Sequence, residues 1–199
     1  MLILDFGSGE TCGNDRDTIT AMIDGLDGLK VKPVIKWQLF TKKSVPYLPP
    51  LTEFDYAYEY AQEKGYETTA SVFDRDSLKK LQKYDTPFIK IANRPELYDM
   101  LKDIDNPLVS VPSVALAEKM RADGIPFMCC ISAYPASRRQ YCRTFHNLMK
   151  DGLSDHSTTW ALYDTYTPKY YECHYALDGQ TGQEVGTWTR TPEKLRLKF

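Results

Sequence analysis

Two histidines near the end of the chain stand in similar positions, each closing a short segment that is mostly apolar. His156 lies in the segment LSDHS (153–157) and His174 in YECHY (171–175). Neighbouring strands lie ~4.8 Å apart, so imidazoles at the ends of two such strands can reach one divalent ion at ~2.0–2.2 Å. Oxygen ligands from water or substrate would complete a shell that suits Mn²⁺ as well as zinc. The alternative for each is an ordinary core or surface histidine, which is our interpretation of His146 in its helical pattern.

Two lysines interrupt apolar runs in the first half of the chain. Lys36 lies in PVIKWQLF (33–40) and Lys90 in FIKIAN (88–93). A buried charge without a partner is costly, so lysines at the ends of two strands indicate a cationic pocket floor. Phosphate or carboxylate would neutralise such a floor. The alternative is that each lysine stem passes the strand end and reaches solvent.

Further polar residues occupy late positions in apolar runs. They are Asp5, Ser132, Tyr134, Ser154 and Glu172. Side chains alternate along a strand, so Ser154 shares a face with His156, and Glu172 shares a face with His174. These residues could bind a substrate or serve as general bases, although ordinary solvation at a strand end explains a single one equally well.

The elements that must position these residues alternate along the chain. Strands are expected at 2–7, 33–40, 66–73, 88–93, 107–113, 126–135, 152–157 and 169–178. Helical patterns are expected at 15–28, 52–65, 74–84, 94–104, 114–124, 138–152, 158–167 and, as a stub, 191–199. About eight alternations favour a closed (β/α)₈ TIM barrel, shortened and with a rudimentary last helix. An open, doubly wound sheet is the alternative architecture.

Composition narrows the class of protein. The chain has 199 residues and a net charge of −2, which argues against a nucleic-acid binder. It contains no apolar run of ~20 residues, as a membrane span requires, and its first residues do not resemble a signal peptide. The five cysteines include no CxxC pair, which indicates reduced thiols and a cytoplasmic location. The Gly-rich segment GSGETCG (7–13) lacks nucleotide-binding spacing.

Several of these segments together resemble the sialic acid (N-acetylneuraminate) synthase family. The stretches GLSDHS (152–157), ECHYALD (172–178) and TPEKL (191–195) are similar to its motifs in the same order. Similar stretches are VIKWQLF (34–40), the segment 68–93 and CISAYPAS (130–137). The resemblance implies a single catalytic TIM barrel over residues 1–199, without the family's C-terminal antifreeze-like domain. It also implies that phosphoenolpyruvate condenses with an N-acyl sugar such as N-acetylmannosamine, giving a nonulosonic acid and phosphate.

The resemblance also implies roles for individual residues. His156 and His174 would hold a divalent metal, usually Mn²⁺, with Mg²⁺ or Co²⁺ as alternatives. Phosphoenolpyruvate would be bound by two lysines and a set of hydroxyl groups: Lys36, Ser71, Lys90, Ser132, Tyr134 and Ser154. Asp5 and Glu172 would be the catalytic carboxylates.

The sequence departs from the family's pattern in several places. The first-strand Asn-His motif is replaced by SGETCG (8–13), and Asp5 stands where the family has a glutamate. The fifth-strand STGM motif reads VPSV (111–114), and the acidic residue after the eighth strand aligns near Glu184 or Val185. The acceptor is therefore expected to differ from N-acetylmannosamine.

Two other functions remain open from the sequence. One is a catalytically degenerate barrel that serves as a binding or assembly module. The other is a lysine-dependent aldolase in which Lys90 forms a Schiff base. A homo-oligomer could form through the tyrosine-rich segment DYAYEYAQ (55–62), although packing within the core is the commoner role of such a segment.

Overall fold

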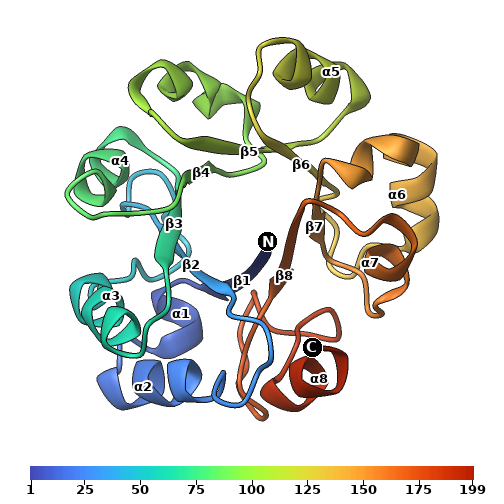
Figure 1. Cartoon of the computed structure of the whole chain (residues 1–199). Helices are drawn as coiled ribbons and strands as arrows, with labels where there is room; N and C mark the ends of the chain where they lie inside the picture. Colours follow the sequence, from blue (N-terminus) through green and yellow to red (C-terminus); the bar gives the residue numbers. More distant parts are fainter.

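In a computed structural model that describes residues 1–199, parallel strands close into one barrel in the order β1 to β8. Helices surround the barrel on the outside, and the view along its axis shows the ring complete between β8 and β1 (Figure 1). The strands are β1 (Leu2–Gly7), β2 (Val34–Leu39), β3 (Thr68–Val72), β4 (Ile89–Ile91), β5 (Pro107–Val111), β6 (Phe127–Cys130), β7 (Gly152–Asp155) and β8 (Tyr170–His174). The predicted TIM barrel is confirmed, and the open sheet is excluded.

The helices follow the strands in the predicted order, mostly shorter than the sequence pattern indicates. They are α1 (Gly9–Cys12), α2 (Arg16–Asp24), α3 (Phe54–Glu63), α4 (Arg75–Leu81), α5 (Val114–Ala122), α6 (Arg138–Phe145), α7 (Ala161–Tyr166) and α8 (Pro192–Lys198). Two predicted helical segments are partly or wholly 3₁₀ instead, at η1 (Pro95–Asp103) and η2 (His146–Lys150). The 138–152 helix breaks because His146 adopts a φ of 44°, which a continuing α-helix does not allow.

The one-turn helix α1 was not predicted. Ser8 caps it by accepting from the Glu10 N–H, and Gly13 ends it with a φ of 64°. A single turn shows no apolar periodicity, so the Gly-rich segment that contains it reads as a loop. This turn matters because it borders the candidate site described below.

The interior of the barrel is built in two layers. The lower layer is an apolar plug of inward-facing side chains: Ile3, Val34, Phe88, Leu108 and Met128. Two residues further along each strand, the inward positions carry polar groups, since side chains alternate between faces. The ladder pairs Asp5 with Lys36, Ser71 with Lys90, and Ser154 with Glu172. The outward positions pack against the helices in the main core.

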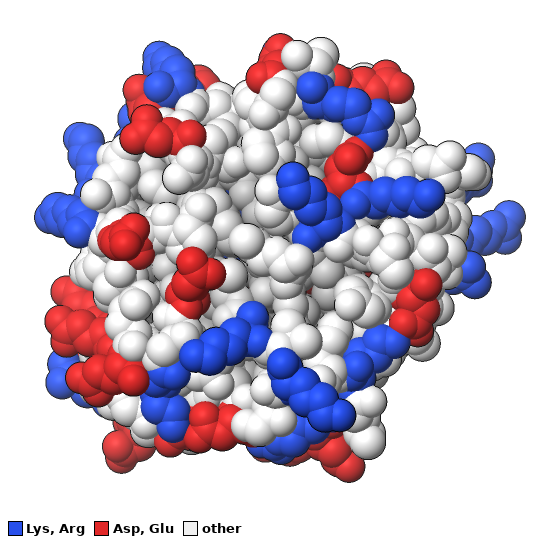
Figure 2. Space-filling view, viewed as in Figure 1, with Lys and Arg blue, Asp and Glu red and all other residues white.

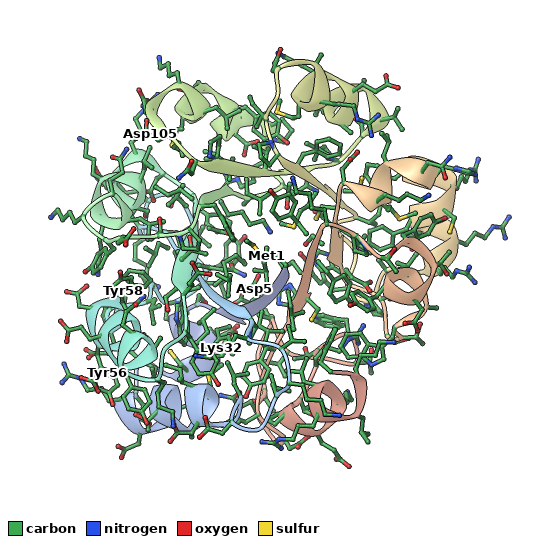
Figure 3. The ribbon with its side chains drawn as sticks, in the orientation of Figure 1. Met1, Asp5, Lys32, Tyr56, Tyr58 and Asp105 are labelled. Carbon is green, nitrogen blue, oxygen red and sulfur yellow. The ribbon has the colours of Figure 1, made fainter.

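The outer surface carries both signs of charge around its rim (Figure 2). The tyrosines of α3 serve contacts within the chain: Tyr56 shares a hydrogen bond with Thr20, and Tyr60 donates to Asp24. Tyr58 donates to the Asp85 carbonyl, and Tyr56 and Tyr58 lie on the outer ring of helices (Figure 3). None of the helices is long and apolar enough to cross a membrane.

Candidate active site

A pocket of about 460 Å³ opens at the carboxyl ends of the strands. All the side chains predicted to bind substrate or metal lie on its wall: Asp5, Lys36, Ser71, Lys90, Ser132, Tyr134, Ser154, His156, Glu172 and His174. They come from the ends of strands and from the segments directly after them, which are distant in sequence and are brought together by closure of the barrel. Asp5 points into the interior from β1 (Figure 3).

The floor of the pocket is a buried, charge-balanced cluster. The Lys36 Nζ lies 2.7 Å from the Asp5 Oδ2 and 3.7 Å from the Glu172 Oε2. Lys90 donates to the other oxygen of Glu172. None of these four side chains is more than 5% exposed. The prediction of a cationic floor is therefore wrong as stated, because each lysine already has a carboxylate partner.

Neutral groups fix the orientation of these charges. The Asp5 carboxylate accepts from the Gly7 N–H at 3.0 Å and from the Gln38 side-chain amide at 3.1 Å. Lys36 donates to the Ser71 hydroxyl at 3.1 Å, and the Ser154 hydroxyl donates to Glu172 at 2.8 Å. The Glu172 Oε2 accepts no hydrogen bond although it is buried. That oxygen is therefore free for a donor that a ligand or water would bring.

Burial and pairing act in opposite directions on the pKa values of the cluster. Burial alone would raise the pKa of Asp5, but the ammonium of Lys36 lowers it well below its usual range. The pKa of Glu172 is lowered in the same way by Lys36 and Lys90. Burial lowers the pKa of Lys90 more strongly than Glu172 raises it. The pKa of Lys36 is raised by Asp5 and Glu172 against the effect of burial.

His156 and His174 face each other at the rim of the pocket, with ring centroids 5.2 Å apart. The Nδ1 of His156 donates to the Ile131 carbonyl at 2.7 Å, which makes its Nε2 the acceptor nitrogen. The Ser154 hydroxyl lies 3.4 Å from that Nε2. Burial lowers the pKa of His156 to about 3, and the pKa of His174 is lowered by the same cause. Both rings are thus neutral at physiological pH, the form that binds metal ions.

The backbone around His156 is held from two sides. Tyr141 of α6 donates its hydroxyl proton to the Ser154 carbonyl at 2.6 Å. The hydroxyl oxygen of Tyr141 accepts from the His156 N–H at 3.1 Å. The Ala136 N–H donates to the His156 carbonyl at 2.9 Å. These contacts hold the main chain at His156, and the bond from Nδ1 to the Ile131 carbonyl holds its ring.

Ser132 and Tyr134 lie on the loop after β6, which ends at Cys130, and not on the strand as predicted. The Ser132 hydroxyl accepts from the Asn93 side chain at 2.8 Å. The Tyr134 ring packs at a tilt of 33° against His156, with centroids 4.3 Å apart, and stands edge-on to His174 at 5.7 Å. Tyr134 is 48% exposed, so it forms the outer wall of the pocket.

The residues present fit a divalent ion held by two protein ligands. The imidazoles are neutral, and the Nδ1 contact of His156 directs its other nitrogen away from the backbone. No cluster of three or more His, Cys, Asp or Glu side chains has metal-ligand geometry. The remaining coordination positions of an ion between the histidines would therefore fall to water or substrate oxygens.

Glu184 is the site residue whose position the sequence predicted least precisely. It lies on the segment after β8 and folds back over α1, where its Oε2 accepts from the Ser8 N–H, the Ser8 hydroxyl and the Thr11 hydroxyl at 2.8, 2.9 and 3.1 Å. Burial, followed by repulsion from Asp5, raises its pKa to about 7. The only sequence signal was an acidic residue near the expected position in an irregular segment.

Comparisons with known proteins identify the fold. No family model matches the chain, and no curated protein matches it significantly in sequence. The structure is similar to N-acetylneuraminic acid (sialic acid) synthetase from Leptospira borgpetersenii in complex with citrate, with a TM-score of 0.78 and 22% identity over 98% of this chain and 80% of that chain. It is also similar to the spore coat polysaccharide biosynthesis protein E from Chromobacterium violaceum, with a TM-score of 0.73 and 15% identity over 98% of this chain and 71% of that chain.

The fold and pocket thus define a TIM barrel with polar residues gathered at the carboxyl ends of its strands. Among such barrels, this chain shares its fold with a sialic acid synthetase.

Proposed function

We propose that this protein is an enzyme that condenses phosphoenolpyruvate with an N-acyl sugar aldehyde resembling N-acetylmannosamine, forming a nonulosonic acid and phosphate. The observation that carries the proposal is one pocket in which a neutral histidine pair stands above two buried lysines. The fold shared with a sialic acid synthetase supports it. That synthetase holds citrate, a small multivalent anion of the same chemical class as phosphoenolpyruvate.

Lys36 and Lys90 would bind the phosphate and carboxylate of the donor. Since both are paired with carboxylates, an incoming trianion must share or replace those partners. The hydroxyls of Ser71 and Ser154, already hydrogen-bonded to the cluster, can turn their donors toward the ligand. Ser132 and Tyr134 would close the outer side of the donor site.

The condensation forms a bond between C3 of phosphoenolpyruvate and the aldehyde carbon. Water then adds to C2, and phosphate leaves with cleavage of the C–O bond, so that atoms and charge balance. A divalent ion, proposed as Mn²⁺ and held by His156 and His174, would supply Lewis-acid polarisation of the aldehyde oxygen when bound.

Three carboxyl groups in the pocket differ in how well they could act as the general base that activates the attacking water. The pKa values of Asp5 and Glu172 are lowered by the lysines, which favours electrostatic roles for these two residues. The pKa of Glu184 is raised to about 7 by burial, and a general base works best when its pKa lies near the working pH. Glu184 therefore joins Asp5 and Glu172 as a candidate base.

Phosphate release tests the proposal. We expect release only when phosphoenolpyruvate, an N-acyl sugar aldehyde and Mn²⁺ are present together. With ¹⁸O in the bridging position of phosphoenolpyruvate, the label should leave in the phosphate, because the C–O bond breaks. His156→Ala and His174→Ala should abolish turnover. His146→Ala, which removes an exposed histidine outside the pocket, should leave it unchanged. No release with any member of an N-acyl sugar panel would refute the proposal.

One observation favours a second candidate, a lysine-dependent aldolase. Burial lowers the pKa of Lys90, and a lowered pKa is what a Schiff-base lysine requires. Incubation with pyruvate and borohydride separates the two activities. A stable adduct on Lys90 would establish the aldolase, whereas the synthase predicts no adduct.

The cellular setting is proposed on the state of the thiols. All the cysteines are free, and unpaired buried thiols suit the reducing cytoplasm. The substrates proposed above are small molecules, and neither nucleic acid nor a membrane has a part in the proposed reaction.

A further inference from the structure

We propose that Arg190 is a positioning residue for the histidine pair: it ties the segment that follows His156 to the end of the strand that carries His174. The inference rests on the proposed role of these histidines as metal ligands, and it concerns a residue outside the pocket wall.

Arg190 is buried to an unusual degree for a charged residue. It is 1% exposed and belongs to the largest fully buried side chains of the molecule. Its guanidinium lies over the Trp160 ring, 4.5 Å from the ring centroid. The nearest acidic oxygen, the Asp155 Oδ2, is 3.9 Å away, which is too far for a hydrogen bond. Asp155 therefore balances the buried charge at longer range, while the hydrogen bonds of the guanidinium go to neutral partners.

The side chain of Arg190 holds the segment after β7. Its Nη2 donates to the Ser157 carbonyl at 3.1 Å and to the Thr159 carbonyl at 2.9 Å. The first of these carbonyls belongs to the residue that follows His156. One nitrogen can bind both carbonyls because Nη2 carries two hydrogens that diverge in the fixed guanidinium plane.

The main chain of Arg190 holds the other histidine. Its N–H donates to the His174 carbonyl at 2.8 Å, and its own carbonyl accepts from the Ala176 N–H at 3.2 Å. These bonds form an isolated parallel bridge with Tyr175 just beyond β8. One residue therefore bonds to the backbone at His174 and, through its side chain, to the backbone next to His156.

This arrangement matters for an ion because no third side chain with metal-ligand geometry joins the pair. With only two imidazoles available to an ion, affinity depends on the distance and angle between their rings. The β7–β8 ladder places the two strands as far as Asp155 and Cys173. Beyond that point the distance and angle depend on the segments that follow, which Arg190 connects. Residues that orient metal ligands without touching the metal typically change affinity roughly ten- to hundredfold when removed.

The test compares Mn²⁺ affinity with stability in the full chain without substrate. Arg190→Met removes the hydrogen-bond donors and keeps an apolar side chain. Arg190→Lys keeps the charge but lacks the planar guanidinium donors. Free Mn²⁺ counted by electron paramagnetic resonance should show affinity reduced roughly ten- to hundredfold in Arg190→Met and less in Arg190→Lys. If Arg190→Met does not fold, Arg190→Lys carries the test.

The control variant is Leu195→Ala, which cuts a fully buried side chain from α8 away from the pocket. It should lower the melting temperature while the folded protein binds Mn²⁺ as the wild type does. Equal affinity in wild type and both Arg190 variants would overturn the positioning role alone. Wild type that fails to bind Mn²⁺, or binds it equally after His156→Ala, would overturn the proposed metal pair and this inference with it.

Discussion

At the scale of single residues, the buried pair of Lys36 and Asp5 is the feature on which the pocket most depends. Both side chains are almost fully buried, and their charged atoms are 2.7 Å apart. Removing one partner of a buried pair leaves the other charge uncompensated, which typically costs about 3–5 kcal/mol. Replacing both partners avoids that cost.

We therefore expect Lys36→Met to lower the free energy of unfolding by about 3–5 kcal/mol. The double variant with Asp5→Asn should recover most of that loss, because the amide still accepts from the Gly7 N–H. Urea denaturation of the two single variants and the double variant measures the coupling. The exposed pair of Arg16 and Glu53 is the control, since solvent screens this pair and Arg16→Ala should cost far less than Lys36→Met. Additive losses at Lys36 and Asp5 would contradict the expectation.

Glu184 makes the stability of the fold depend on pH in a predictable direction. Its pKa is raised to about 7 in the folded state, chiefly by burial, from 4.5. A raised carboxyl pKa means that the folded state binds the proton more tightly, so this group contributes most to stability below about pH 4.5. That contribution falls as the pH rises toward 7.

The free energy of unfolding of Glu184→Gln, compared with that of the wild type, should therefore increase between pH 4.5 and 8. The growth is at most about 3 kcal/mol, at 1.36 kcal/mol for each pKa unit. The amide oxygen of the variant can still accept from Ser8 and Thr11. Unfolding free energies measured across this range by urea denaturation check the sign; a constant margin would show that Glu184 titrates normally.

At the scale of elements, the loop between β2 and α3 is anchored by the residue that caps α4. Asp74 accepts from the Thr41 N–H at 2.7 Å and the Ser44 hydroxyl at 2.5 Å with one oxygen, and from the Ser77 N–H at 2.8 Å with the other. Burial opposes its ionisation, but these donors lower the pKa of Asp74 to about 2. The loop brings Val45, Tyr47 and Leu48 to the pocket wall.

Asp74→Ala should cost about 2–3 kcal/mol, since it removes a helix cap and the loop anchor together. Asp15→Ala, which removes only the cap of α2, should cost less than Asp74→Ala. Hydrogen exchange should speed up at Thr41 and Val45 in the first variant alone. Equal exchange in both variants would refute the anchoring role. Because the pKa of Asp74 is lowered in the folded state, its contribution to stability is present above about pH 4 and lost toward pH 2.

The sequence predicted the elements better than their ends. Strands rich in Val, Ile and Leu, such as 2–7, were recognisable because their inward and outward faces are both buried. The position of Lys36 and Lys90 in apolar runs correctly placed both in the interior of the barrel. Their carboxylate partners could not be assigned. The contact of Lys36 with Asp5 depends on the register of β1 with β2, and the contact of Lys90 with Glu172 forms only across the closed barrel. Glu184 and Arg190 lie in irregular segments where no period indicates which way a side chain points.

At the scale of the whole molecule, closure of a small barrel requires close contact between particular strands. Gly152 begins β7 where that strand pairs with β6. A Cβ added there would lie 2.2 Å from the Phe127 carbonyl oxygen and 2.8 Å from the Met128 side chain. The carbonyl belongs to a strand held on both sides, and Met128 belongs to the apolar plug beneath the charged layer.

We expect Gly152→Ala to destabilise the protein by about 3 kcal/mol or more, because overpacking at a closed ladder has no free edge into which it can relax. Gly124→Ala is the matched control: its φ of 71° disfavours alanine, but nothing lies within 4 Å of the added Cβ, so the cost should stay near 1 kcal/mol. Urea denaturation gives both values. A displaced plug would also admit water to the pair of Lys36 and Asp5, so losses from Gly152→Ala and Lys36→Met should combine to less than their sum. Full additivity would mean that the apolar plug and the charged layer are energetically independent, so that a packing defect in the plug does not affect the stability of the buried ion pair.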